Sequence, residues 1–189
     1  MRLIALVLVL LILFGALVRV YAMAPAAPPP NDDFNNATVI NSVPYNDTKD
    51  TQAATTALDD PIIPGSCFFD LTPRQGSATV WYRYTTPTKG RLRANTFGTL
   101  LYDTVLAVWT GTRGSLSLAA CNDDVSDTDT SSAITLTVSS GTTYYIEVAG
   151  TAPPVSMFRP EAPTLGGILH LHVDFIGDTF LPVILQNSP

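Results

Sequence analysis

Charged side chains are scarce in this 189-residue chain, and their scarcity excludes several classes of protein. Only 14% of the residues are charged, far fewer than coiled coils and disordered segments contain. The 10 Lys and Arg are outnumbered by 16 Asp and Glu, which gives a formal net charge of −6. Nucleic acid is therefore not an expected partner, because binding to phosphates depends on clustered Lys or Arg.

Residues typical of hydrolytic catalysis are equally few. The chain has only two histidines, close together at His170 and His172, and it contains no Gly-x-Ser-x-Gly motif. We therefore expect no enzymatic activity. A small hydrolase that uses a pair of Asp carboxylates is the remaining catalytic alternative, because Asp is plentiful.

The first residues have the pattern of an export signal. Arg2 precedes an apolar run over residues 3–18, and Val20-Tyr21-Ala22 offers small residues at the −3 and −1 positions of a cleavage site. We assign residues 1–22 to a signal peptide, so the protein is expected to be secreted or at the cell surface. The alternative is an uncleaved membrane anchor, because the run falls just short of the ~17–25 residues that span a bilayer.

Three further segments follow the leader. Residues 23–30 are rich in proline, which cannot continue a helix or a central strand, and we expect an extended spacer. Residues 31–177 form the single domain. Residues 178–189 form an apolar tail around Pro182, which could dock as an edge strand or pair with another subunit.

The domain carries the period-two alternation of β-strands. Residues 79–85 place Val80, Tyr82 and Tyr84 on one side, whereas residues 103–110 are more uniformly apolar, as in a central strand covered on both faces. The same alternation recurs over residues 132–138, 142–148 and 168–176. No stretch of ten residues outside the leader has a helical apolar period. The sequence thus predicts an all-β domain, an antiparallel β-sandwich behind an N-terminal signal helix.

Cysteine use agrees with export. Cys67 and Cys121 are the only cysteines, and an even number in an exported protein favours a disulfide. Such a bond would stabilise the fold by ~4 kcal/mol through loop closure. Two free thiols are the alternative.

Five stretches, taken in order, resemble the bacterial pre-peptidase C-terminal (PPC) domain family. They are residues 31–38, 79–87, 102–111, 120–124 and 141–146. The resemblance covers residues 31–176 and implies a jelly-roll-like β-sandwich that aids secretion, targeting or substrate binding beside a secreted hydrolase. Since no catalytic domain accompanies it in this chain, it implies a stand-alone secreted member.

An acidic loop is the first candidate site. Residues 122–129 concentrate four carboxylates that repel one another unless water or a cation neutralises them, and Asp103 could approach from the end of a preceding strand. Flexible loops of this kind bind Ca²⁺ through six to eight oxygens. We expect either a solvated turn or a calcium site, with the candidate ligands Asp103, Asn122, Asp123, Asp124, Asp127 and Asp129.

Aromatic and histidine side chains supply the other candidates. Trp81 and Tyr145 lie out of phase with the inferred inner faces of their strands, so we expect them to be exposed and able to stack on a sugar or anchor a protein. His170 and His172 project to one face of a strand and could serve zinc or copper, but the simpler interpretation is a half-exposed outer face.

Together these features predict a non-catalytic, secreted or cell-surface β-sandwich that binds extracellular carbohydrate or protein, with calcium as the candidate stabilising ion if the acidic loop is not simply a solvated turn. The alternative is a structural subunit of the cell envelope or of a filament, which self-associates through its terminal strand. Membrane contact is expected only through an uncleaved N-terminal segment.

Overall fold

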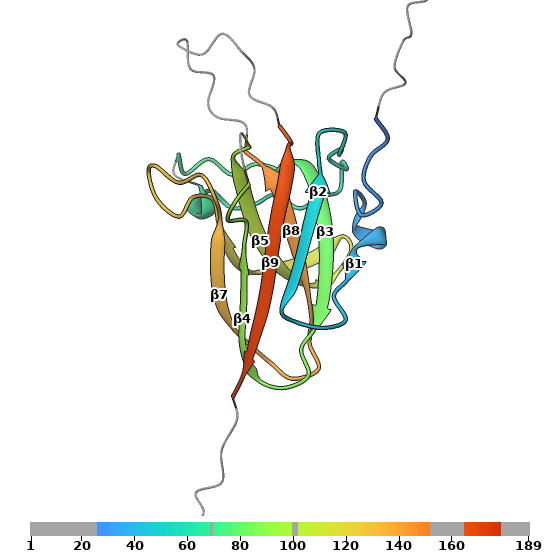
Figure 1. The fold of residues 1–189 in the computed structure, drawn as a ribbon, viewed down its shortest axis with the longest axis vertical. Helices are drawn as coiled ribbons and strands as arrows, with labels where there is room; N and C mark the ends of the chain where they lie inside the picture. The colour runs from blue at the N-terminus through green and yellow to red at the C-terminus, as the bar shows by residue number, and fades with distance from the viewer. Residues whose placement is uncertain (1–25, 69, 100–101, 152–164, 179–189) are drawn as a thin grey trace, which may run out of the picture.

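A computed structural model describes residues 26–68, 70–99, 102–151 and 165–178 of the chain (Figure 1). The predicted signal peptide and nearly all of the C-terminal tail, residues 179–189, lie outside the described residues, so those assignments stay predictions.

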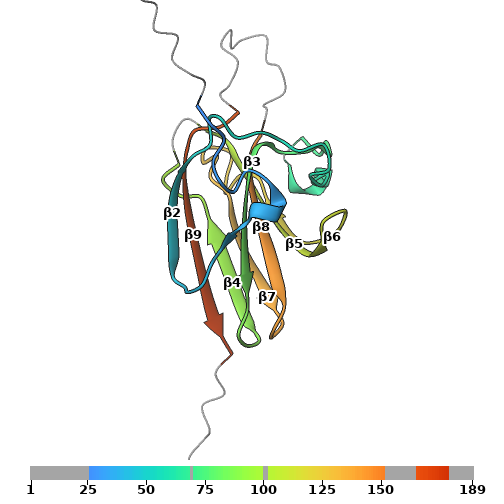
Figure 2. The ribbon, with the colours of Figure 1, turned by 90° about the vertical axis from the view of Figure 1, so that its right-hand side faces the viewer.

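Two β-sheets pack face to face, as an edge-on view makes clear (Figure 2). The five-stranded sheet has the order β1-β3-β8-β5-β6, and the four-stranded sheet has the order β2-β9-β4-β7. Every pairing is antiparallel except that of β1 with β3. The predicted all-β sandwich is confirmed. The strands are β1 (Thr38–Val39), β2 (Tyr45–Asp50), β3 (Ser77–Thr85), β4 (Gly90–Asn95), β5 (Thr104–Thr112), β6 (Ser115–Asn122), β7 (Ala133–Val138), β8 (Thr143–Gly150) and β9 (Ile168–Gly177).

The main core lies between the sheets and follows the alternation of the sequence. Val80, Tyr82 and Tyr84 of β3 point into it, as predicted. Inward residues of β8 and β9 meet them there, among them Ile146 and Leu171. The apolar segment predicted as a central strand is β5, which lies between β8 and β6 and is buried from Thr104 to Trp109.

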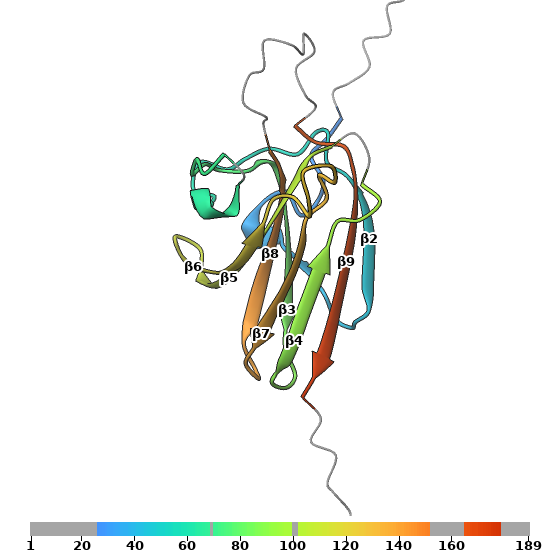
Figure 3. The same cartoon turned by 90° about the vertical axis from the view of Figure 1, so that its left-hand side faces the viewer.

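A second apolar cluster covers the other face of the five-stranded sheet. Two short 3₁₀ helices, η1 (Phe34–Asn36) and η2 (Gly65–Cys67), and the loop around η2 lie on this side, away from the four-stranded sheet (Figure 3). They bury outward residues of three central strands. The cluster comprises Phe34, Ala37, Ile63, Cys67, Phe68, Trp81, Val105, Ala107, Trp109 and Ala149.

The covering segments correct one prediction. Trp81 is 0% exposed, because Phe34 packs edge-on against its ring with the centroids 5.1 Å apart. The expectation that Trp81 is exposed was therefore wrong. Its phase along the strand is as inferred, but the face to which it points is covered rather than open to solvent.

A disulfide joins the covering segment to the sheet. Cys67 of η2 is bonded to Cys121 of β6, with their Cα atoms 5.5 Å apart. The predicted disulfide is thus present. It links residues 54 positions apart and holds η2 beside the end of β6.

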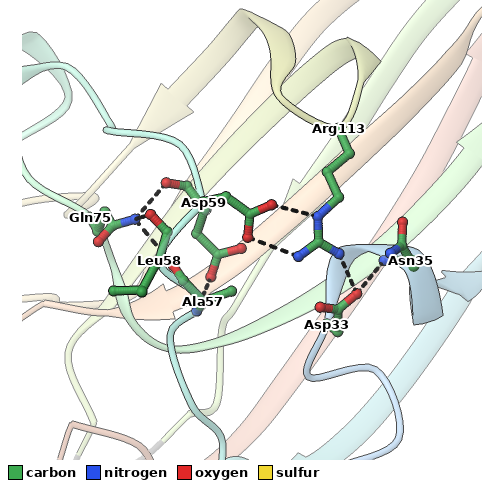
Figure 4. Close-up of polar contacts among 8 residues, drawn as sticks. Asp33, Asn35, Ala57, Leu58, Asp59, Gln75 and Arg113 are labelled. Atoms are coloured by element: carbon green, nitrogen blue, oxygen red, sulfur yellow. Dashed lines mark hydrogen bonds and ion pairs between the residues drawn. The ribbon is translucent and has the colours of Figure 1, made fainter.

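Arg113 adds a polar clamp to the same side of the molecule (Figure 4). It lies in the tight turn between β5 and β6 and donates to both oxygens of Asp59, at 2.6 and 2.8 Å, and to Asp33 at 2.6 Å. Its hydrogen bond to each carboxylate is the main reason why the pKa values of Asp33 and Asp59 are lowered. One cation therefore ties the segment before η1 and the loop before η2 to the same hairpin.

Candidate functional site

The sheet topology gathers three of the predicted calcium ligands. Asp103 immediately precedes β5, and Asp123 and Asp124 immediately follow β6. Because β5 and β6 are antiparallel neighbours, with Leu106 opposite Asn122, the start of one lies beside the end of the other. One carboxylate oxygen from each of the three Asp residues lies within 4.8 Å of the others.

Burial and mutual repulsion shape the electrostatics of this acidic cluster. The pKa of Asp124 is raised to about 6, first by loss of solvent and then by the charges of Asp103, Asp129 and Asp127. Burial likewise raises the pKa of Asp103. The Oδ1 atoms of Asp103 and Asp124 are buried and accept no hydrogen bond from any residue that the structure describes. Crowded carboxylates of this kind gain stability when a cation neutralises them.

The other three predicted ligands lie outside the cluster. The amide of Asn122 donates to the backbone oxygen of Asp124 at 3.0 Å, and its Oδ1 accepts from the backbone N–H of Ala133 at 2.8 Å. This side chain therefore braces the loop. Asp127 and Asp129 are exposed, and Asp129 accepts from the backbone N–H of Ser131 at 3.0 Å. They act on the cluster through their charge.

A pocket of about 540 Å³ lies on the uncovered part of the five-stranded sheet. Its floor is made by outward residues near the end of β3 and the start of β8, where Arg83 pairs with Tyr145 and Thr85 with Thr143. The segment that begins with β1 forms a wall. The lining residues are Val39, Ile40, Asn41, Arg83, Tyr84, Thr85, Pro87, Thr143 and Tyr145.

Tyr145 is held at the border between this pocket and the second cluster. Its ring is partly buried and lies 4.4 Å from that of Phe34, at an interplanar angle of 34°. The two predicted ligand-binding aromatics thus have different places, since Trp81 lies beneath the cover and Tyr145 at its edge, within a pocket.

Arg83 is a feature of this pocket that the sequence did not single out. It is exposed, and in the described ranges it forms no ion pair with a carboxylate, whereas Arg74 and Arg113 both do. The Thr85 and Thr143 hydroxyls beside it hydrogen-bond to each other at 2.8 Å. The pocket therefore offers an aromatic ring, a cation and hydroxyl groups on one rigid sheet.

Glu147 is a titratable residue buried inside the second cluster. It is 0% exposed, and the indole N–H of Trp109 donates to its Oε2 at 2.7 Å. Burial raises its pKa to about 8, against a smaller lowering effect of that hydrogen bond. Since the covering segments separate Glu147 from solvent, we assign it to the interior.

Comparisons with known proteins assign no family. No family model matches the chain, and no curated protein matches it. Among solved structures, a similar one is CorA, a surface-associated copper-binding protein important in Methylomicrobium album BG8 copper acquisition. The two chains are 11% identical with a TM-score of 0.48, over 74% of this chain and 98% of the other. This likeness is too weak to carry an argument about function.

Within the described ranges, no helix has the length and apolar character needed to cross a bilayer.

Proposed function

We propose that this protein is a non-catalytic, exported β-sandwich module that binds carbohydrate through the Tyr145 pocket. The pocket itself is the observation that carries the proposal. Its volume of about 540 Å³ falls within the range typical of small-ligand sites, and it lies where the second cluster ends and the sheet is open to solvent.

The lining residues suit a sugar ring. The Tyr145 ring can stack against the apolar face of a pyranose, and Phe34 holds that ring in place from behind. Arg83, Asn41 and the paired Thr hydroxyls can hydrogen-bond to ring substituents. Because Arg83, Tyr145 and the paired Thr residues come from neighbouring strands of one sheet, their backbones are fixed before binding and little conformational entropy is lost.

Glycan-array screening followed by titration calorimetry tests the proposal. We expect array binding by the wild-type protein and at least about a tenfold loss of affinity in Tyr145→Ala. Phe97→Ala is the matched control, because Phe97 is an exposed aromatic residue outside the pocket. A blank array, or equal losses in both variants, would contradict carbohydrate binding at this site. The pocket would then be expected to bind a protein partner instead of a carbohydrate.

We also propose that the Asp103–Asp123–Asp124 cluster binds calcium and thereby stabilises the domain. Carboxylate oxygens are the ligands that calcium prefers, and backbone carbonyls of the loop and water can complete its shell. At a calcium concentration of ~100 times Kd, mass action stabilises the fold by ~2.7 kcal/mol, which corresponds to a rise in Tm of ~5–10 °C.

Thermal melts with calcium and with excess chelator test this second site. We expect the calcium-dependent rise in Tm to disappear in Asp124→Asn and to persist in Asp178→Asn, a surface carboxylate at the far end of β9. Equal melting temperatures with calcium and with chelator would show that calcium does not stabilise the domain.

Two features support an extracellular location. The Cys67–Cys121 disulfide suits an oxidising compartment, and the N-terminal sequence has the pattern of an export signal. Assembly through the terminal strand stays an alternative prediction, because it depends on residues outside the described ranges. Size-exclusion chromatography of the full chain against one that ends at Gly177 tests it, since only assembly predicts a loss of oligomers on truncation.

A further inference from the structure

The outer face of the four-stranded sheet presents both histidines of the chain on one strand. β9 lies between β2 and β4 (Figure 1), and it pairs with β2 over residues 168–173 and with β4 over residues 172–177. The backbone N–H of His170 donates to Oγ1 of Thr99 at 3.0 Å. His170 is exposed and His172 is half-buried, while Leu169, Leu171 and Val173 between and beside them point into the core. The two imidazoles therefore project from a fixed backbone toward solvent.

Strand β2 orients both rings through their Nδ1 atoms. The Nδ1 atom of His172 lies 2.8 Å from Oδ1 of Asn46, and that of His170 lies 3.2 Å from Oγ1 of Thr48. These contacts follow from the register, which pairs Asn46 with His172 and Thr48 with His170. With the amide oxygen as acceptor, Nδ1 of His172 is the donor, and Nε2 of the neutral ring keeps a lone pair. The Thr48 hydroxyl can accept in the same way from His170.

This arrangement is the one that metal-binding histidines use. A hydrogen bond to one ring nitrogen fixes the tautomer and the ring orientation, and leaves the other nitrogen to bind the ion. Residues two apart on a strand lie ~7 Å apart at their Cα atoms and point to the same face. Two imidazoles so spaced can converge on one ion at nitrogen–metal distances of ~2.0–2.1 Å.

A carboxylate follows on the same strand. Asp174 is two residues beyond His172, and one of its oxygens accepts from the backbone N–H of Phe175 at 2.8 Å. Asp174 is four residues from His170, about 13 Å along the strand, so its carboxylate adds negative charge beside the imidazoles and is not a shared ligand. The nearest cation by register is Arg93 of β4, which pairs with Asp174. No ion pair joins them in the described part of the chain, so this carboxylate is not neutralised by contact.

We propose that His170 and His172 bind a divalent transition-metal ion through their Nε2 atoms, with water completing its coordination. Imidazole nitrogen suits copper(II) and zinc, and copper(II) binds more tightly than zinc to a given set of nitrogen and oxygen ligands. The site is distinct from the acidic cluster in position and in chemistry, because calcium avoids nitrogen ligands. It does not depend on carbohydrate binding.

Titration of the full chain with copper(II), followed by calorimetry and by electron paramagnetic resonance, tests the proposal. We expect one tight site whose spectrum shows hyperfine coupling to two imidazole nitrogens. His170→Gln and His172→Gln should each weaken binding at least about tenfold, and the double variant should abolish it. Asn46→Ala, which removes only the partner of Nδ1, should weaken binding by about tenfold or more without removing a ligand.

Asp124→Asn and an excess of calcium serve as controls, and both should leave copper affinity unchanged. Circular dichroism of each variant establishes that the sheets are intact. Undiminished copper affinity in the folded double variant, or a spectrum without two coupled imidazole nitrogens in the wild-type protein, would overturn the assignment. Loss of copper binding in Asp124→Asn would instead place the ion at the acidic cluster.

Discussion

Replacing Glu147 by glutamine should make the protein more stable at high pH, although it removes a carboxylate from the centre of an apolar cluster. Glu147 is 0% exposed, and it stands among Trp81, Trp109 and Ala107, with no cation near its carboxyl group in the described part of the chain. A buried carboxyl group without a cation prefers to remain protonated. The substitution keeps the shape of the side chain and removes its titration.

The size of the effect follows from the pKa. Burial raises the pKa of Glu147 from 4.5 to about 8 in the folded protein. The folded state therefore holds a proton that the unfolded chain releases near pH 4.5, so the free energy of unfolding falls as the pH rises from 4.5 toward 8. A shift of this size corresponds to a loss on the order of 5 kcal/mol between those limits, at ~1.4 kcal/mol per pKa unit. Above pH 8 the loss is complete.

Urea denaturation measures this loss, and tryptophan fluorescence reports it well, because both Trp81 and Trp109 lie in the same cluster as Glu147. Other groups titrate over the same range, so the informative quantity is the difference between variant and wild type at each pH. At pH 5 we expect Glu147→Gln to be equal to the wild type or less stable by ~1–3 kcal/mol, because its amide N–H groups lack a partner. At pH 9 it should be the more stable protein.

Asp178→Asn is the control, since it removes an exposed carboxylate and should leave the wild-type slope unchanged. If the stabilities of wild type and Glu147→Gln run parallel from pH 5 to pH 9, Glu147 is ionised in the folded state and the reasoning is wrong.

Three further predictions concern the segments that cover the sheet and the acidic cluster. Arg113→Met should lower Tm more at low salt than at 0.5 M NaCl, because the ion pairs of Arg113 with Asp33 and Asp59 are exposed enough for salt to screen them. Thermal melts at both salt concentrations measure the difference, and a loss of Tm that does not depend on salt would contradict the prediction. Replacing Cys67 and Cys121 together by serine should cost ~4 kcal/mol in urea denaturation, whereas a loss below ~1 kcal/mol would mean that η2 is held without the bond. The calcium-dependent rise in Tm should shrink as the pH falls below about 6, because Asp124 becomes protonated there. Thermal melts with calcium and with chelator between pH 5 and pH 7 measure this, and a rise that stays constant down to pH 5 would exclude Asp124 as a ligand.

The sandwich and most of its strands could be predicted because burial alternates along them. β3, β5, β7, β8 and β9 all coincide with predicted stretches, since their inward side chains are large and apolar. β2 lies at the edge of its sheet and buries few side chains, so its sequence over Tyr45–Asp50 is almost wholly polar. The apolar alternation that indicates a strand is therefore absent there, and β2 was missed. β4 was missed because small and charged residues obscure its two core positions, Leu92 and Ala94.

The second cluster could not be predicted from local pattern. Trp81 and Glu147 have the phase of solvent-facing residues, and only the chain segments that carry Phe34 and Ile63 bury them. Their contacts join positions far apart in sequence, so no period within a strand signals them. The sequence did indicate the acidic loop and the approach of Asp103, but the register of β5 against β6 decides which carboxylates meet.

Nuclear magnetic resonance mapping of a bound oligosaccharide tests the proposed function most directly. With a glycan found on the array, the account predicts that the largest shift changes cluster at Arg83, Thr143 and Tyr145, on the open part of the five-stranded sheet. Shift changes centred on the opposite sheet, or spread evenly over the surface, would contradict it.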